Sequence, residues 1–244
     1  MAKATERIFL PMLHLIIPEL VDINMPLEGV FHNCAIISIK AKYPGSACKA
    51  MNSIWGMGQM MYTKLIVVVD ETVNVQNLAE VRDAVLENVK GANNLVISEG
   101  PLDALDHSSN QALYGNRLGV DATNRNVREE ANKITDTYHI LLVHKEKAWQ
   151  GRDSLVEYMN CNSDKFTIAV DDDILPTDLS TIMWKVFNNI DAKRDIVILD
   201  HKIGIDATKK WREEGLSRDW PNDITMTDEI KHLVDERWNE YGID

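Results

Sequence analysis

A long internal repeat constrains the fold of this sequence more than any other feature. The segment Val67–Ile97 (VVVDETVNVQNLAEVRDAVLENVKGANNLVI) recurs as Ile168–Ile198 (IAVDDDILPTDLSTIMWKVFNNIDAKRDIVI), with Asp70 matching Asp171. Two shorter blocks flank both copies in the same order: Ala35–Gly45 with Ile140–Gly151, and Leu118–Thr123 with Ile203–Thr208. Three similar blocks in one order indicate a duplicated unit. We therefore predict two related half-domains, at about 24–123 and 138–210.

The first copy carries the hydrophobic pattern of a layered α/β domain. Three unalternating apolar runs are typical of strands that are covered on both faces: Cys34–Ile39, Leu65–Val69 and Leu95–Ile97. Between them the apolar spacing predicts two helices, Ser46–Met61 and one that starts at Asn77, where Glu80 stands near a capping-box position. The order predicts an α/β fold, a layered Rossmann-like sheet with flanking helices whose core is duplicated in tandem.

The second copy is shorter than the first in two places, and helices flank the pair. Of the first helix it keeps only Arg152–Asn160, and it lacks the loop Pro101–Asn116. We expect an N-terminal helix in 1–23 that links to a missing upstream domain, a first unit at 24–123 and a degenerate second copy at 124–220. Thr227 then predicts the N-cap of a C-terminal amphipathic helix in 221–244, which packs on its own domain or on a neighbouring subunit.

Composition and charge narrow the classes of function. The formal net charge of −12 disfavours binding to nucleic-acid backbones. No apolar run approaches the length of a transmembrane helix, and residues 1–21 lack the pattern of a signal peptide. The three scattered cysteines, Cys34, Cys48 and Cys161, favour reduced thiols buried as small hydrophobic residues. We therefore expect a cytoplasmic protein without a transmembrane segment.

The chemically suggestive motifs all have simpler interpretations. Gly56-Met-Gly58 lacks the third glycine of a dinucleotide fingerprint and falls inside a predicted helix. Asp171–Asp173 follows a strand and could hold Mg²⁺ or Mn²⁺, but acids at strand ends also cap helices or face water. His107 has several polar neighbours in sequence, and we interpret it as a satisfied loop histidine. The residue chemistry alone gives no self-evident active site.

Several longer strings resemble the UbiD family of prenylated-flavin decarboxylases, in the region of its C-terminal domain. They are KATERIFLP (Lys3–Pro11), PLEGVFHN (Pro26–Asn33), GMGQMMYTKLIVVVDETVNVQN (Gly56–Asn77), EGPLDALDH (Glu99–His107) and IGIDATKKW (Ile203–Trp211). The resemblance implies decarboxylation of an aromatic or α,β-unsaturated acid of the polyprenyl-hydroxybenzoate type, as in ubiquinone biosynthesis. It also implies prenylated FMN with Mn²⁺ and K⁺, and homo-oligomers joined largely through this domain.

In that family the catalytic arginine, the acids and the metal ligands belong to a preceding flavin-binding domain, whose acid motif is missing here. The resemblance places Gln59, Tyr62 and Thr63, with the loop Pro101–His107, near the flavin as a cofactor-binding pocket wall. The second copy has Ser163 and Asp164 where the first has Tyr62 and Thr63, so it resembles a scaffold.

The leading hypothesis is therefore an oligomerisation and pocket-wall domain that is inactive and binds no cofactor tightly on its own. One alternative is a stand-alone binding or interaction protein derived from this domain by duplication. A metal-dependent sugar- or phosphate-transfer enzyme built on Asp171–Asp173 is a third hypothesis, although no basic phosphate clamp accompanies these acids.

Overall fold

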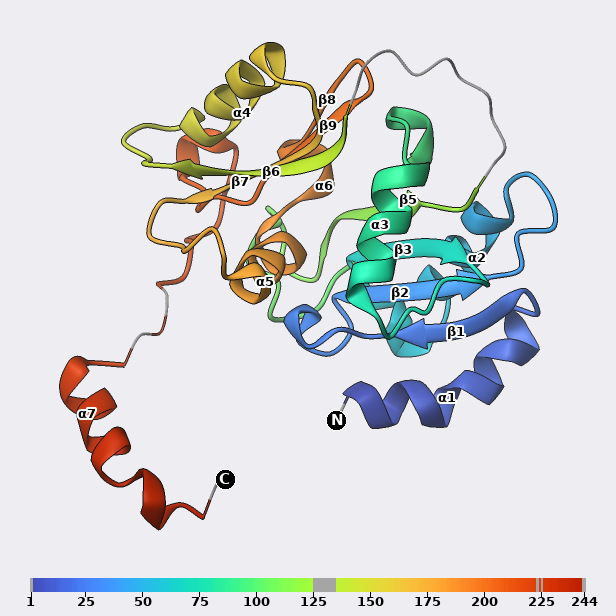
Figure 1. Cartoon of the computed structure of the whole chain (residues 1–244), viewed down its shortest axis with the longest axis horizontal. Helices are drawn as coiled ribbons and strands as arrows, with labels where there is room; N and C mark the ends of the chain where they lie inside the picture. The colour runs from blue at the N-terminus through green and yellow to red at the C-terminus, as the bar shows by residue number, and fades with distance from the viewer. Residues whose placement is uncertain (1, 125–134, 223, 225, 243–244) are drawn as a thin grey trace.

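The chain forms two mixed β-sheets, one from each predicted copy (Figure 1). The computed structural model describes residues 2–124, 135–222, 224 and 226–242, so residues 125–134 of the predicted second copy lie outside the described part. The first sheet has the order β1-β2-β3-β5-β4 and consists of β1 (Leu20–Asn24), β2 (Cys34–Ile39), β3 (Leu65–Asp70), β4 (Leu95–Pro101) and β5 (Tyr114–Asp121). The second has the order β6-β7-β9-β8 and consists of β6 (Thr135–Val143), β7 (Asp164–Asp171), β8 (Ile196–Leu199) and β9 (Lys202–Asp206).

The two sheets repeat one pattern of strand directions. In the first, β2, β3 and β5 are parallel and β4 is antiparallel to β5. In the second, β6, β7 and β9 are parallel and β8 is antiparallel to β9. Only β1, which pairs antiparallel with β2, has no counterpart among the described strands of the second sheet. The predicted α/β class is confirmed, whereas the predicted domain bounds stay a prediction.

Helices separate and cover the sheets. Six α-helices belong to the layered body: α1 (Ala2–Ile16), α2 (Ser46–Trp55), α3 (Leu78–Asn88), α4 (Gln150–Cys161), α5 (Leu179–Asn189) and α6 (Ala192–Asp195). Helices α1 and α2 pack on the outer face of the first sheet, and α4 packs on the outer face of the second. Helices α3 and α5 lie between the sheets, where side chains from both copies form one continuous core (Figure 1). The copies are therefore not two separate folding units, because each buries its inner face against the other.

Matched hydrogen bonds support the duplication at the level of single residues. The side chain of Asn77 caps α3 by accepting from Ala79 N, and that of Asp178 caps α5 by accepting from Thr181 N. After the last parallel strand of each copy, a threonine donates its backbone N–H and its hydroxyl to the aspartate two residues earlier: Thr123 to Asp121 and Thr208 to Asp206.

Close packing behind the last parallel strand is also repeated. A Cβ added to Gly119 would lie 2.5 Å from Met51 Sδ, and one added to Gly204 would lie 2.6 Å from Met159 Sδ. In both copies, therefore, a glycine lets the helix on the outer face approach the sheet closely.

Two predictions of local structure were wrong, and one strand was not predicted. Helix α1 ends at Ile16, within the predicted range 1–23, but Leu20–Asn24 of the same range form strand β1. Helix α2 ends at Trp55, and the chain continues as the 3₁₀ helix η2 (Gly58–Tyr62). The second copy does not lack most of this helix, because α4 spans Gln150–Cys161; what it lacks is a counterpart of η2.

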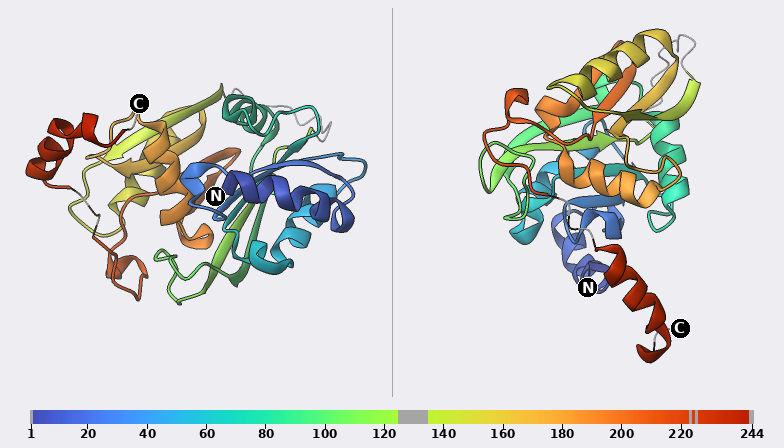
Figure 2. Two further views of the ribbon diagram at one scale, coloured as in Figure 1. Left: turned by 90° about the horizontal axis from the view of Figure 1, so that it is seen from below. Right: turned by 90° about the vertical axis from the view of Figure 1, so that its left-hand side faces the viewer.

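The C-terminal helix α7 (Asp228–Glu236) stands away from both sheets (Figures 1 and 2). Thr227 Oγ1 accepts from Ile230 N, which confirms the predicted N-cap. None of its residues is buried, so packing on its own domain is not what the structure shows. The cysteine prediction holds for Cys34, which is buried, but not for Cys48 and Cys161, which are exposed. In the described part of the chain, no helix is long and apolar enough to span a membrane.

Candidate functional site

The predicted wall residues lie at the edge of the first sheet where its parallel strands begin. Strand β2 is preceded by His32 and Asn33, β3 by the segment of η2 and Thr63, and the register aligns Leu65 with Leu118. Because β4 is antiparallel to β5, the loop that follows β4 returns to this same edge. The edge therefore gathers η2, residues 31–33 and the start of the loop 101–113.

Two buried side chains fix the end of η2 and the residue that follows it. Trp55 Nε1 donates to Thr63 O at 2.9 Å, and Arg117 Nη1 donates to Met61 O at 3.1 Å. The guanidinium of Arg117 also lies 4.8 Å from the ring centroid of Trp55, in a cation–π contact. Burial lowers the pKa of Arg117 from its ordinary value.

The glycine of the Glu99–His107 motif has a packing role here. A Cβ on Gly100 would meet the guanidinium carbon of Arg117 at 2.4 Å, so the glycine leaves room for this arginine in its present position.

His32 joins this segment to the loop. Its Nε2 lies 3.1 Å from Asp103 Oδ2, its ring centroid lies 5.9 Å from that of Tyr62, and its side chain is 12% exposed. Neither ring nitrogen of His32 has a hydrogen bond of acceptable geometry, despite the short distance to Asp103. Sequence reasoning missed His32 as a site residue, although it lies in the Pro26–Asn33 motif.

Unpartnered polar atoms are concentrated at this edge. Both ring nitrogens of His32, the hydroxyl of Thr63 and Nε of Arg117 are buried without a hydrogen-bond partner among the described residues. Buried polar groups are normally paired, and exceptions need an explanation such as a missing ligand or water. Thr63 is completely buried, Tyr62 is half-buried and Gln59 is exposed. The edge therefore combines buried, unpartnered polar atoms with the neighbouring rings of His32 and Tyr62.

The second copy does not build such an edge. Helix α4 ends at Cys161 and β7 begins at Asp164, which leaves no room for a counterpart of η2. Strands β8 and β9 are joined by Asp200 and His201 alone, where the first copy has its long loop.

The other motifs have structural roles. Asp171 accepts from Lys209 N at 3.0 Å, and Asp172 pairs with His144 Nδ1 at 2.8 Å, so two of the three acids have protein partners. Burial raises the pKa of Asp171. His107 Nε2 lies 3.1 Å from Asn189 Oδ1, as expected for a satisfied loop histidine. Within the described ranges, no three His, Cys, Asp or Glu side chains come together as a metal site.

An open pocket of about 430 Å³ lies on the other side of the loop, between the copies. Its lining includes Tyr114, Asn116, Trp149, Lys193 and Glu214. None of the predicted wall residues contributes to it, so this pocket and the η2 edge are separate features of the surface.

Comparison with known proteins assigns the chain that forms this edge to a family. The family profile described as "3-octaprenyl-4-hydroxybenzoate carboxy-lyase C-terminal domain" matches residues 1–122 and 143–211. The chain belongs to the UbiD family, as its C-terminal domain. The match includes η2, His32 and Arg117, and it extends over most of the second copy.

The relatives of this UbiD domain are longer proteins. An uncharacterized protein of Archaeoglobus fulgidus is 35% identical over 241 residues, which cover 98% of this chain and 32% of the relative. One from Helicobacter pylori strain J99 is 31% identical over 258 residues, covering 94% of this chain and 42% of the relative. The chain thus spans about a third of the first of these curated relatives and less than half of the second.

Similar solved structures are also UbiD-class enzymes. HmfF from Pelotomaculum thermopropionicum, solved with FMN, is 26% identical with a TM-score of 0.46, covering 55% of this chain and 30% of that one. Vanillic acid decarboxylase of Sedimentibacter hydroxybenzoicus is 28% identical with a TM-score of 0.44, covering 62% of this chain and 31% of that one.

Proposed function

We propose that this UbiD domain is the pocket-wall and oligomerisation part of a decarboxylase that acts on an aromatic or α,β-unsaturated acid. The substrate would be of the polyprenyl-hydroxybenzoate type, and catalysis would occur on a flavin-binding domain outside this chain. The observation that carries the proposal is the η2 edge, where the family motifs bring Tyr62, Thr63 and His32 together with buried, unpartnered polar atoms.

The residues at the edge fit one wall of a cofactor site. A flavin or its substrate would give Thr63 Oγ1 and His32 Nδ1 the partners that they lack, while Tyr62 and Gln59 would supply contact area. Prenylated FMN would supply the electron sink for loss of CO₂. The described residues do not fit the Mn²⁺ site, because no suitable group of three ligands exists among them. We therefore assign Mn²⁺ to the flavin domain.

In this role the chain's residues orient rather than transfer protons. Tyr62 and Thr63 would fix the position of the acid against the flavin, which lowers the barrier by restricting its orientation. Asp103 would hold the His32 ring toward the same side. The rigid frame of Trp55 and Arg117 keeps Met61 and the following residues in place during this contact.

Flavin retention tests the division of labour. The purified chain is incubated with prenylated FMN, Mn²⁺ and K⁺, desalted and examined by visible spectroscopy, alone and after addition of a separately produced UbiD flavin domain. We expect no flavin band from the chain alone and CO₂ release only from the mixture. A stoichiometric band and decarboxylation by the unaided chain would contradict the proposal.

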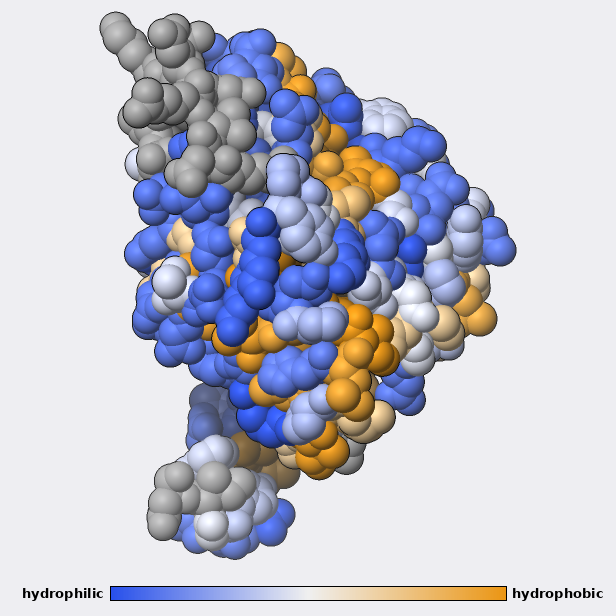
Figure 3. All heavy atoms as spheres, turned by 90° about the vertical axis from the view of Figure 1, so that its right-hand side faces the viewer, coloured by the Kyte–Doolittle hydropathy of each residue, from blue (hydrophilic) through white to orange (hydrophobic). Residues whose placement is uncertain are grey.

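Exposed apolar helix faces support the oligomerisation part. On α7, Ile230 and Leu233 are 44% and 51% exposed, and on the turn that follows it Trp238 and Tyr241 are 47% and 42% exposed. On α1, five large apolar side chains are exposed: Ile8, Phe9, Met12, Leu15 and Ile16. Apolar surface gathers at the lower end of the body in Figure 3, the level at which α1 lies in Figure 1. Patches of this kind mark interaction surfaces.

The same faces favour one alternative, a stand-alone binding protein derived by duplication. Analytical ultracentrifugation of the chain with and without residues 225–244 separates the two. A homo-oligomer that dissociates on deletion supports the first proposal. A monomer that captures other proteins only when the tail is present supports the alternative.

A further inference from the structure

One short segment of the second copy fastens the long loop of the first. The segment 188–191 lies where α5 ends and α6 begins. Ser108 Oγ donates to Ile190 O at 2.9 Å, and His107 Nε2 lies 3.1 Å from Asn189 Oδ1. Asn116 Nδ2 also donates to Asp191 Oδ1 at 2.9 Å, near the start of β5. We call this row of contacts between the two copies the seam.

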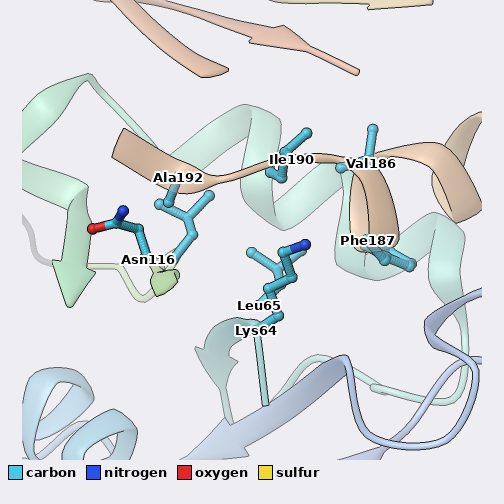
Figure 4. Close-up of a pocket in the computed structure, with 8 residues that line it drawn as sticks. Lys64, Leu65, Asn116, Val186, Phe187, Ile190 and Ala192 are labelled. Atoms are coloured by element: carbon cyan, nitrogen blue, oxygen red, sulfur yellow. The ribbon is translucent and has the colours of Figure 1, made fainter. Parts of the chain in front are cut away.

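A buried lysine completes the attachment. Lys64 Nζ donates to Ser108 Oγ at 2.6 Å and to Asn188 O at 3.1 Å, and it pairs with Asp106. Figure 4 shows Lys64 at the start of β3, facing the stretch that carries Val186 and Ile190. The side chains of Lys64 and Asp106 are 3% and 2% exposed. The carbonyls at the C-terminal end of α5 carry partial negative charge, so this end of the helix favours a cation.

The opposite half repeats the lysine but not the loop. Lys165 occupies the position that corresponds to Lys64, and its Nζ donates to Leu86 O near the end of α3. Each copy thus places a buried lysine against a helix end of the other. The second copy, however, has only Asp200 and His201 between β8 and β9, so it has no comparable loop for the first copy to hold. The second copy therefore holds a long loop of the first, but the first copy holds no such loop of the second.

We propose that the second copy acts as a positioning element. Its segment 188–191 holds the loop 102–113 in the conformation that places Asp103 beside His32. That this loop faces the substrate rests on the proposed function, whereas its attachment to the second copy does not. In this view the duplication replaces a mobile pocket-wall loop with a preset one, which reduces the ordering entropy lost on binding an acid.

Hydrogen–deuterium exchange measured on the full chain tests the attachment without any cofactor. Asn189→Ala removes the partner of His107 from the second copy, and Ser108→Ala removes the bond to Ile190 O from the loop side. We expect peptides from 102–110 to exchange on the order of 5- to 10-fold faster in Asn189→Ala, relative to peptides of β2 and β3, as for one lost hydrogen bond. The acceleration in Ser108→Ala should be at least as large, because this variant also removes the hydroxyl that accepts from Lys64 Nζ.

Lys165→Met is the matched control, because it removes the corresponding seam bond in the other direction. It should lower global stability and leave the relative exchange of 102–110 within about twofold of the wild type. Unchanged loop exchange in both Asn189→Ala and Ser108→Ala would overturn the proposal. Equal acceleration by Lys165→Met would do so as well, because the effect would then be general loosening. Because Asn189→Ala and Ser108→Ala lie on opposite sides of the seam, either variant alone can give a result if the other does not fold.

Steady-state kinetics of the enzyme reconstituted with its flavin domain then separates positioning from stability. Per folded site, Asn189→Ala should raise KM for the acid several-fold and change kcat by less than about twofold. A loss of kcat that only follows the folded fraction, with KM unchanged, would assign Asn189 a structural role and refute the positioning role. Absence of any activity in the reconstituted wild type would refute the proposed function and leave the exchange result standing.

Discussion

Replacing Lys64 by methionine is the perturbation for which the structure gives the most definite energetic consequence. The side chain keeps its approximate length but loses its charge, while Asp106 remains buried at 2% exposure. Removing one partner of a buried ion pair typically costs about 3–5 kcal/mol, because it leaves an uncompensated charge. Ser108 N and Ser109 N still donate to Asp106 Oδ1 at 3.2 and 3.1 Å. We therefore expect a loss near the lower end, about 3 kcal/mol.

The pH dependence of this loss has a definite sign. Burial raises the pKa of Asp106, but the charge and hydrogen bond of Lys64 outweigh burial and hold it below its ordinary value. In the wild type the pair therefore stabilises the fold fully above the unfolded carboxyl pKa of about 3.9, and this stabilisation is lost as pH falls through the lower folded value. Without Lys64, burial should raise the pKa of Asp106 above the unfolded value. The deficit of the variant should then be full at pH 7 and shrink as the pH falls toward 4.

Urea unfolding at pH 7 and pH 5, followed by circular dichroism, measures both effects. Arg82→Met is the control, because Arg82 pairs with Asp83 on the surface with side chains 47% and 65% exposed. It should change the unfolding free energy by less than about 1 kcal/mol. The double variant Lys64→Met with Asp106→Asn should recover most of the loss, because no unpaired charge remains and the amide Oδ1 can still accept from Ser108 N and Ser109 N. A Lys64→Met deficit below about 1 kcal/mol at pH 7, or one that grows on acidification, would refute the reasoning.

Three further outcomes follow from local geometry. Gly119→Ala should cost about 1–3 kcal/mol in urea unfolding, because the new Cβ would lie 2.5 Å from Met51 Sδ; a neutral result would mean that Met51 moves aside freely. Asn77→Ala removes the N-cap of α3 and should lower the unfolding free energy by about 1 kcal/mol in the same assay. An unchanged unfolding free energy would mean that another group caps the helix. Hydrogen bonds from Lys49 and Tyr43 lower the pKa of Glu19 to about 2, and an NMR titration should find this value. In Lys49→Ala the pKa of Glu19 should return toward its ordinary value. A pKa near 4 in the wild type would contradict this contact.

The local elements of each copy follow from the sequence because their signals are short-range. The run Cys34–Ile39 is a strand with the predicted bounds, since an unalternating apolar hexamer suits a strand covered on both faces. Asn77 and Thr227 cap helices because their side chains reach backbone N–H groups only a few residues away. Strand β1 was missed because the apolar residues after Pro18 keep the helical spacing, and only pairing with β2 decides in favour of a strand.

The candidate site is only partly visible in the sequence for a related reason. The motif that contains Tyr62 and Thr63 is contiguous, and it could be assigned by resemblance to the family. The contact of His32 with Asp103 joins residues that lie far apart in the chain, and it forms only because β2 and the loop after β4 meet at one sheet edge. The role of Arg117 likewise depends on strand register, which brings it beside Ser98 and Gly100.

By itself, the sequence determined the α/β class, the duplication, the starts of α2, α3 and α7, and the family, because each depends on local patterns or contiguous motifs. The tertiary structure alone decided how the two copies combine. The sequence repeat predicts two similar units, but nothing in it shows that α3 and α5 share one core between the sheets. The repeat also does not show that Lys64 and Lys165 each bond to a helix end of the other copy. Such contacts depend on how two nearly equivalent surfaces fit together, and that fit is set by shape and burial over the whole interface rather than by any short segment.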